Sequence, residues 1–412
     1  MFFRLATKSL FNRKGSVTLT LLAMTVSILV LLGVEHVRNQ ARDSFANTVS
    51  GVDLIVGART GSLNLLLYSV FRIGAPTNNI AWQSYEKVAA DPNVSWAVPI
   101  SLGDSHQGYR VMGTSAAYFE HFRYGSDHGL AFDEGQRFDR VLDVVLGAEV
   151  ARKLGYALGD KLVLAHGMAQ TSFSLHDDKP FTVVGILEPT GTPVDQTLHV
   201  SLQGIEAIHA DWQDGVKSPS SHSNLDVPSA EELQPRQLTA MLLGLESRLA
   251  TFTVQRKINE FEDEPLMAIL PGVALTELWQ VMGILENTLR LVSVLVLIAA
   301  LLGLAAMLLA SIREREHEIQ LLRIIGASPL FLFGLIQIEA LLIAATSALL
   351  GTAGLYLALL LSQDTVASQF GLQLSTSIFT THSLLFLLII FLSTVFIATI
   401  PAVNAYQNAK QL

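Results

Sequence analysis

Four stretches of the chain are each about eighteen residues or longer and contain at most one charged residue. A run of that length is what an α-helix needs to cross the hydrocarbon core of a bilayer. The stretches therefore predict a polytopic α-helical membrane protein, in keeping with the apolar half of its 412 residues. They are Val17–Val34, Leu291–Ala310, Leu330–Leu361 and Ser383–Val403.

The first apolar stretch is longer than the apolar core of a typical secretory signal peptide. It is followed by Glu35-His36-Val37-Arg38 and lacks a small-x-small cleavage site. We therefore expect this stretch to be a retained helix of the protein.

The distribution of charged residues predicts the orientation of these helices. Outside residues 35–288, nine residues are basic, and all of them except Arg290 lie near the N-terminus, in 311–328 or near the C-terminus. Positive charge favours the cytoplasmic side, so these three segments are predicted to be cytoplasmic. Residues 35–288 then lie outside the cytoplasm, and their 18 basic and 31 acidic residues argue against a nucleic-acid partner.

The predicted fold class is a polytopic α-helical membrane protein with four transmembrane helices and a large α+β periplasmic domain inserted between helices 1 and 2. The segments are a cytoplasmic amphipathic segment (1–14), the first transmembrane helix (15–34), the periplasmic domain with a helical stalk (35–288), the second helix (289–310), a cytoplasmic helix (311–328), the third transmembrane helix (329–361), a short periplasmic loop (362–382), the fourth helix (383–403) and a cytoplasmic tail (404–412).

Within the periplasmic domain, apolar runs alternate with helical segments and turns. Gly155 is placed to end a short helix, the apolar run Leu63–Phe71 is expected to pack near the membrane or a partner, and the polar stretch Gln213–Pro235 to form a loop. Strands are predicted at Val94–Pro99, Tyr109–Gly113, Val141–Leu146, Lys161–Ala165 and Phe181–Leu187, and helices at Ala81–Ala90, Ala148–Leu154, Gln237–Phe261 and Leu275–Asn287.

The stretch SIREREHEIQLLRIIGAS, residues 311–328, joins two apolar stretches and has the spacing of an amphipathic helix. Gly326 is placed to end that helix, and Ser328 can cap the next one with Pro329 at its first position. The spacing leaves two interpretations open. The helix transmits force from a protein that docks on it, or it is a charged hairpin that only fixes topology. One stripe holds Arg313, Glu316, Gln320, Arg323 and Ala327, and another holds Ile312, Ile319, Leu322 and Ile325.

The segment REREHEIQLLRIIGAS resembles the cytoplasmic coupling segment of MacB/FtsX/LolC-type ABC transporter permeases, although Ile324 stands where that family often has alanine. RLATKSLFNRKGSVTLTLLAMTVSI resembles the family's N-terminal region. VVLGAEVARKLGYALGDKLVL and FTVVGILEPTGTPVDQTLHVS resemble its periplasmic core domain. IEALLIAATSALLGTAG resembles its third span. Residues 53–80 and 213–235 match the common pattern less well.

The resemblance implies a permease subunit whose ATPase activity, with its ATP and Mg²⁺, resides in a separate ABC ATP-binding subunit. That subunit would dock on 311–328, which we name the coupling segment. A homodimer or a heterodimer with a related permease is expected, because two ATP-binding subunits need two docking sites. The resemblance and the helical spacing together predict the ATPase-coupling residues. They are Arg313, Arg315, Glu316, Ile319, Leu322, Arg323, Gly326 and Ala327.

Motifs for catalysis are missing from the sequence. It contains no G-x-x-x-x-G-K-[ST], no H-E-x-x-H, no G-x-S-x-G and no cysteine. We therefore predict no catalytic residues and no cofactor bound by this chain. Eight histidines lie between His106 and His222, including His121, His128 and the cluster His176-Asp177-Asp178. They suggest a metal ion or a metal-binding partner, but their spacings fit no ligand motif, so we interpret them as surface residues and predict no metal site.

Small residues mark predicted contacts between membrane helices. Those of the second helix would form a dimer or pack within the chain. Glu339 is either a functional carboxylate within the third helix or a shallow residue bonded to a neighbouring helix, which is the interpretation we favour. The predicted contact residues are Ala299, Gly303, Ala306, Ala310, Glu339, Gly351 and Gly354, and Ala344, Ala348 and Thr352 share a further face.

The predicted function is that of a multi-pass permease of the bacterial inner membrane that converts ATP hydrolysis by its partner into motion of the periplasmic domain. This motion would drive export or extrusion of a periplasmic or membrane-anchored substrate, with a periplasmic adaptor or binding protein as a further candidate partner. The alternatives are a mechanotransmission regulator of a periplasmic enzyme or metal-binding partner, and a receptor or anchor that works without an ATPase.

Overall fold

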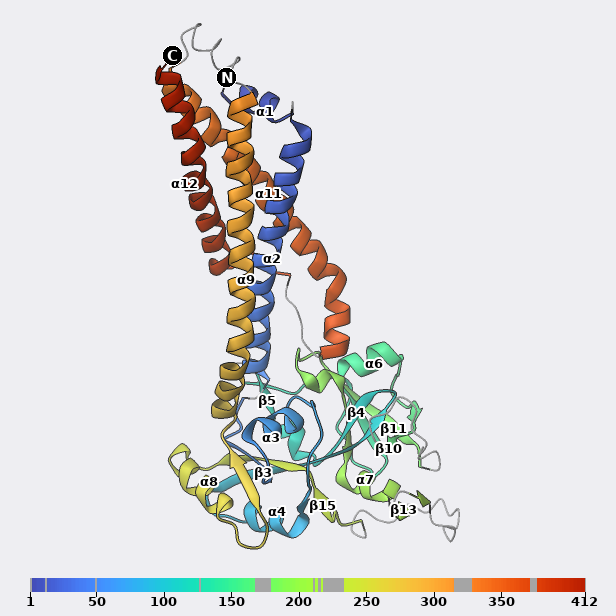
Figure 1. The fold of residues 1–412 in the computed structure, drawn as a ribbon. Helices are drawn as coiled ribbons and strands as arrows, with labels where there is room; N and C mark the ends of the chain where they lie inside the picture. The colour runs from blue at the N-terminus through green and yellow to red at the C-terminus, as the bar shows by residue number, and fades with distance from the viewer. Residues whose placement is uncertain are drawn as a thin grey trace. The chain divides into compact units, whose positions relative to one another are not determined.

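The computed structural model describes residues 2–11, 13–48, 50–125, 127–166, 179–209, 212–213, 216–217, 233–314, 328–370 and 376–411. The chain forms two compact units, each of which can be followed in Figure 1. The helical unit comprises Met1–Gln40, Met282–Asp364 and Leu374–Leu412, and the α+β unit comprises Ala41–Val281 and Thr365–Gln373.

The helical unit is built from long helices whose cores are apolar. Four of them are long and apolar enough to cross a membrane, over Lys14–Arg42, Pro271–Glu314, Leu330–Ser362 and Thr381–Asn404, and each contains one of the stretches predicted from the sequence. The helices to which this unit's residues belong are α1 (Phe2–Phe11), α2 (Lys14–Asn47), α9 (Pro271–Glu314), α11 (Pro329–Phe370) and α12 (Thr381–Gln411).

One apolar cluster holds these helices together. It includes Ile28 from α2, Leu304 from α9, Ile343 from α11 and Ile390 from α12, all at most 1% exposed. Leu10 of α1 packs against the same cluster. Because an α-helix satisfies its own backbone donors and acceptors, apolar side chains of this kind are free to face either each other or lipid.

Two helices extend beyond the predicted spans. α9 begins at Pro271, a residue suited to the first turn because it has no N–H to satisfy. α11 continues to Phe370, so part of the loop predicted at 362–382 is helical. The helix boundaries predicted from composition were therefore too narrow. A helix can continue through polar residues after it has left an apolar environment.

A mixed sheet of eleven strands forms the centre of the α+β unit. Its order is β17-β1-β16-β3-β4-β12-β8-β11-β7, with β10 paired to β3 and β9 to β11. β12–β4 and β11–β8 are parallel pairs, and the others are antiparallel. The strands of this sheet are β1 (Leu54–Ala58), β3 (Val94–His106), β4 (Tyr109–Thr114), β7 (Phe132–Gly135), β8 (Asp143–Leu146), β9 (Lys161–Leu162), β10 (Ala165–His166), β11 (Phe181–Leu187), β12 (Thr197–Ser201), β16 (Ala240–Leu245) and β17 (Leu266–Ile269).

Short strands and helices surround this sheet. The two-stranded pairs are β13 (Trp212–Gln213) with β14 (Val216–Lys217), β15 (Gln237–Leu238) with β2 (Ile80–Ala81), and β5 (Arg123–Tyr124) with β6 (His128–Gly129). The helices are α3 (Ser62–Ser69), α4 (Trp82–Ala89), α5 (Ala117–His121), α6 (Ala148–Leu154), α7 (Leu202–His209) and α8 (Thr251–Asn259), with 3-10 turns η1 (Pro193–Gln196) and η2 (Arg248–Ala250). Gly155 ends α6 at a φ of 71°, as predicted.

The helix predicted over Gln237–Phe261 is wrong in its first part. Ala240–Leu245 forms strand β16, which pairs with β1 on one side and β3 on the other. Ala, Met and Leu favour helices in isolation, but pairing with two strands in a buried position overrides that preference. Gly244 fits the strand because the ring of Trp96 lies where a side chain would be. Only Thr251–Asn259 is helical, as α8.

The apolar run Leu63–Phe71 packs inside the α+β unit and not on a membrane or partner surface. It forms α3, whose residues Leu65, Leu66 and Tyr68 are fully buried in the core. The run follows strand β1 and a turn. Its buried side chains pack against residues of the sheet. A short apolar helix in a sequence has the same composition whether its cover is lipid or protein, which is why the prediction failed.

Candidate functional site

The coupling segment lies between the end of α9 and the start of α11. Arg313 is exposed in the last turn of α9. The Oγ of Ser328 accepts a hydrogen bond from the Phe331 amide at 3.3 Å, and Pro329 is the first residue of α11. Ser328 therefore caps this helix as the sequence predicted. The other coupling residues, Arg315, Glu316, Ile319, Leu322, Arg323, Gly326 and Ala327, lie outside the described residues.

Arg13 contacts the end of α9 where the coupling segment begins. Its Nη2 donates to the carbonyl oxygen of Ser311 at 3.0 Å, and its Nε lies 3.5 Å from Oε2 of Glu314. The Arg13 side chain is only 14% exposed. The last carbonyls of a helix have no partner within it, so a guanidinium there is favourable both as a donor and as a positive charge.

From the sequence, Arg13 is expected only as part of the basic, amphipathic N-terminal segment or of a charge cluster that fixes topology. The sequence feature that could have indicated this contact is the position of Arg13 between an amphipathic segment and the first apolar stretch. The structure places it between α1 and α2, so it joins the start of α2 to the end of α9. Arg13 therefore holds the last turn of α9, where the coupling segment begins.

A second set of ion pairs joins α2 and α9 beyond the other end of their apolar stretches. Arg38 donates from Nε to Glu286 and from Nη1 to Glu35, both at 2.9 Å. Arg290 donates to the same Glu35 carboxylate at 2.9 Å. Glu35 is 12% exposed and pairs with both guanidinium groups, and Glu286 supplies the second negative charge. Arg290 was the one basic residue that the charge clusters did not account for, and this network gives it a partner.

The small residues of α11 pack against α2 within the chain. A side chain at Gly351 would meet the carbonyl oxygen of Thr25 and Cγ2 of Ile28, each at 3.1 Å. A side chain at Gly354 would meet Leu29 at 3.1 Å. Glycine therefore lets the two helices approach closely. Ala344 and Ala348 are also buried on this face.

The small residues of α9 are exposed instead. Ala299, Gly303, Ala306 and Ala310 all lie on the surface of this single chain, and a Cβ at Gly303 would meet no atom within 4 Å. Ala299 and Gly303 line an apolar groove of about 630 Å³ between α2 and α9. Among the described residues this face is uncovered, and the dimer contact through it stays a prediction.

Glu339 is 2% exposed within the helical unit. Two residues earlier on α11, the side-chain amide of Gln337 donates to Thr399 Oγ1 of α12 at 3.2 Å. Polar side chains of α11 thus face neighbouring helices at this level.

The histidines of the α+β unit have varied environments. His121 stacks on Trp96, with ring centroids 4.9 Å apart, and His128 is exposed. His166 and His209 converge on the buried carboxylate of Asp104. Burial alone would raise the pKa of Asp104, but the hydrogen bonds and charges of the two histidines outweigh it and lower the pKa to about 2. His176 and His222 lie outside the described residues.

Comparison with known families identifies this architecture. The family of the MacB-like periplasmic core domain matches residues 17–242, more than half of the chain, and that of the FtsX-like permease C-terminal matches residues 290–408. The chain belongs to the MacB/FtsX-type ABC transporter permeases. The second match includes the coupling segment and three of the four candidate membrane helices, so the resemblance seen in the sequence is confirmed.

Two solved structures are similar to parts of this permease. The periplasmic region of MacB from Actinobacillus actinomycetemcomitans is 9% identical and covers 56% of this chain and 94% of its own, with a TM-score of 0.36. The extracellular domain of the noncanonic ABC-type transporter YknZ from Gram-positive bacteria is 12% identical and covers 53% of this chain and 98% of its own, with a TM-score of 0.31. Among curated protein sequences, none matches the chain.

Proposed function

We propose that this permease transmits work from a separate ABC ATPase to an α+β domain in the periplasm, inserted between the first and second membrane helices. The match of the FtsX-like permease C-terminal family over residues 290–408 carries this proposal, because it includes the whole coupling segment. Members of the family work with ABC ATPase partners. The sequence itself has no phosphate-binding loop, so ATP and Mg²⁺ would be bound by the partner.

Two features of the helical unit support a mechanical role. Residues 14–47 and 271–314 each form one unbroken helix, and a continuous helix can carry a push or a tilt along its length. α2 and α9 are also tied to each other by charged contacts on both sides of their apolar stretches, through Arg13 and through Glu35. The pair would therefore move together when the coupling segment is displaced.

The output of this motion is export or extrusion of a periplasmic or membrane-anchored substrate from the inner membrane. Among described residues of the candidate spans, only Glu339 is a fully buried carboxylate amid apolar stretches. A pathway for a charged substrate across the bilayer would need more ionisable groups than this. Work done outside the membrane is the simpler account.

Charge reversal in the coupling segment tests the proposal. The chain is purified with its ATPase partner, and ATPase activity is compared between wild type and the variants E316R and R323E. We expect each variant to reduce permease-stimulated ATP hydrolysis at least about tenfold, because a docking surface loses its charge complementarity. K410E, which changes a charge in the predicted cytoplasmic tail, serves as the matched control and should keep full stimulation.

Two outcomes would contradict the proposal. Full stimulation in both reversed variants would mean that the segment does not dock an ATPase. Purification in mild detergent without any ATP-binding protein would instead favour a receptor or anchor that works alone. Membrane yield of each variant must equal that of wild type, so that loss of insertion is not mistaken for loss of coupling.

A further inference from the structure

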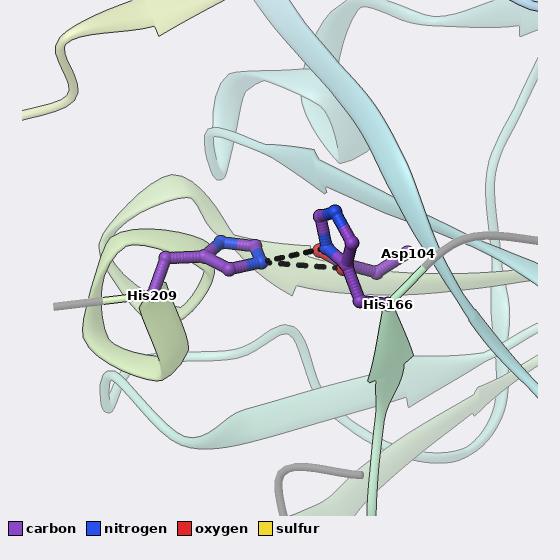
Figure 2. A group of neighbouring side chains, drawn as sticks. All are labelled: Asp104, His166 and His209. Atoms are coloured by element: carbon purple, nitrogen blue, oxygen red, sulfur yellow. Dashed lines mark hydrogen bonds and ion pairs between the residues drawn. The ribbon is translucent and has the colours of Figure 1, made fainter. Parts of the chain in front are cut away.

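Three side chains from distant parts of the sequence meet beside strand β3 of the α+β unit (Figure 2). Asp104 lies on β3, and His166 is directly opposite it on β10 in the antiparallel pairing. His209 is the last residue of α7. His166 is 62 residues from Asp104 and 43 from His209, so no short motif could have announced this cluster.

The three ligand atoms form a nearly equilateral triangle. Nδ1 of His166 is 3.2 Å from Oδ1 of Asp104 and 3.2 Å from Nε2 of His209, and Nε2 of His209 is 3.4 Å from the same Oδ1. An ion with bonds of about 2.0–2.1 Å and tetrahedral angles separates its ligand atoms by about 3.3 Å. An octahedral ion with three ligands on one face would separate them by about 3 Å. The observed triangle fits the tetrahedral case better.

Protons alone cannot satisfy all three of these contacts. If both ring nitrogens carry a proton, both can donate to the Asp104 oxygen, but they then point two donors at each other. If one nitrogen has no proton, its lone pair faces the carboxylate instead. With the Asp104 carboxylate ionised, each protonation state of the two rings therefore leaves at least one contact unfavourable. A cation between the three atoms removes the conflict, because each atom then offers a lone pair to it.

The site is anchored on its inner side and open on its outer side. The Asp104 side chain is 2% exposed, which holds its carboxylate in place on a central strand of the sheet. The His166 and His209 side chains are 57% and 30% exposed. A bound ion would therefore have three protein ligands and a fourth position that solvent or another molecule can reach, the arrangement of zinc sites that exchange a ligand.

We propose that Asp104, His166 and His209 bind one divalent first-row transition metal ion, with zinc as the best fit. Imidazole nitrogen and a single carboxylate suit zinc, whereas Mg²⁺ and Ca²⁺ require mostly oxygen ligands. The ion would connect β3, β10 and the end of α7. This departs from the interpretation of the histidines as surface residues, and it does not depend on the proposed coupling to an ATPase.

Metal titration of the full chain tests the site. The protein is purified in detergent without a polyhistidine tag, treated with a chelator and titrated with Zn²⁺ by calorimetry. We expect one ion per chain, and H166A and H209A should each weaken binding at least about tenfold. H128A removes an exposed histidine from the same unit and should bind as wild type does. Substitution with Co²⁺ should give the intense visible absorption of a four-coordinate ion, and Mg²⁺ and Ca²⁺ should not displace it.

Several results would overturn the proposal. Equal zinc binding by wild type, H166A and H209A would place the metal elsewhere, and no binding by wild type at micromolar Zn²⁺ would remove the site. Weak visible absorption of the Co²⁺ form would contradict the tetrahedral geometry. Because His166 is exposed, H166A should fold normally, which keeps the test decisive even if D104N, at a buried position, lowers the stability of the chain.

Discussion

The α+β unit keeps polar side chains inside its core, whereas the helical unit places its described ion pairs on either side of its apolar stretches. Asp195 and His199 are 6% and 0% exposed within the α+β unit. In the helical unit the ion pairs involve Arg13 and Glu314 at one level and Glu35 with its two arginines at another. Among the described residues of the helical unit, Glu339 is the one buried carboxylate, and the other buried polar groups there are mostly hydroxyls such as those of Ser347 and Thr394.

This difference follows from what surrounds each unit. A domain in water can hold a buried polar group in position with several hydrogen bonds, and its stability then depends on those bonds and on pH. Helices in lipid gain little from burying apolar surface against each other, so close fit decides their association. We therefore expect polar substitutions to act strongly in the α+β unit and steric ones to act in the helical unit.

The largest effect is expected for Asp195→Ala. The Asp195 carboxylate accepts hydrogen bonds from the amides of Thr190 and Gly191 and from the Thr190 hydroxyl, each at 2.8 Å. Its removal leaves both amides without this acceptor in a part-buried turn, which should lower the unfolding free energy by about 3–5 kcal/mol. All four tryptophans lie in residues 82–279, so urea unfolding followed by their fluorescence reports on this unit.

Asp133→Ala is the matched control for this prediction, because Asp133 is exposed. It should change the unfolding free energy by less than about 0.5 kcal/mol. Similar effects of both substitutions would mean that the internal hydrogen bonds of the α+β unit contribute little.

A pH dependence is expected from His199. Burial, and secondly the charge of Arg72, lower the pKa of His199 to about 3, whereas an unfolded histidine titrates near 6.5. Below pH 6.5 the unfolded chain therefore takes up a proton that the folded chain does not. The unfolding free energy should fall by about 1.6 kcal/mol between pH 6.5 and pH 5 from this residue alone.

His199→Phe should reduce the slope of stability against pH over that range, because phenylalanine does not titrate. Its ring can still stack on Tyr118, whose ring centroid lies 5.4 Å from that of the histidine. His128→Phe, at an exposed position, should leave the slope unchanged. Urea unfolding at several pH values measures both. An identical slope in wild type and H199F would contradict the assignment.

A smaller, steric effect is expected for Gly351→Leu in the helical unit. The new side chain would meet Ile28 and the Thr25 carbonyl of α2, and overpacking of this kind costs about 1–3 kcal/mol. Thermal unfolding of the detergent-solubilised chain, followed by circular dichroism, should show a lower midpoint. Gly303→Leu should leave the midpoint unchanged, because its position is open.

The smallest effect on folding, but a clear one on assembly, is expected at the exposed face of α9. If a second permease subunit covers this face, cysteines at Gly303 or Ala306 should form disulfide-linked dimers in membranes. A cysteine at Ala348, which faces α2 within the chain, should not. Monomers from all three variants, in a complex that still hydrolyses ATP, would place the dimer contact elsewhere.

The sequence predicted those elements whose signal is local. The four apolar stretches, the strand Phe181–Leu187 and the end of α6 at Gly155 are all confirmed. In each case the composition or the conformational freedom of a few adjacent residues decides the structure, whatever lies around them.

What the sequence could not predict depends on contacts between distant residues. The strand Ala240–Leu245 has a helical composition, and only its two neighbouring strands make it extended. The contact of Arg13 with Ser311 joins residues 298 positions apart. The convergence of His166 and His209 on Asp104 likewise requires the sheet to be assembled first. Spacing arguments do not reach such pairs.

The sidedness of the chain tests the central claim most directly, and the absence of cysteine makes the measurement clean. Single cysteines are placed at Ser328, the last residue of the coupling segment, and at Asp133 in the α+β unit, both of which are exposed. We expect a membrane-impermeant thiol reagent to label D133C in intact spheroplasts and S328C only after the membrane is opened. Labelling of both positions from the same side would contradict a permease that carries work across the membrane.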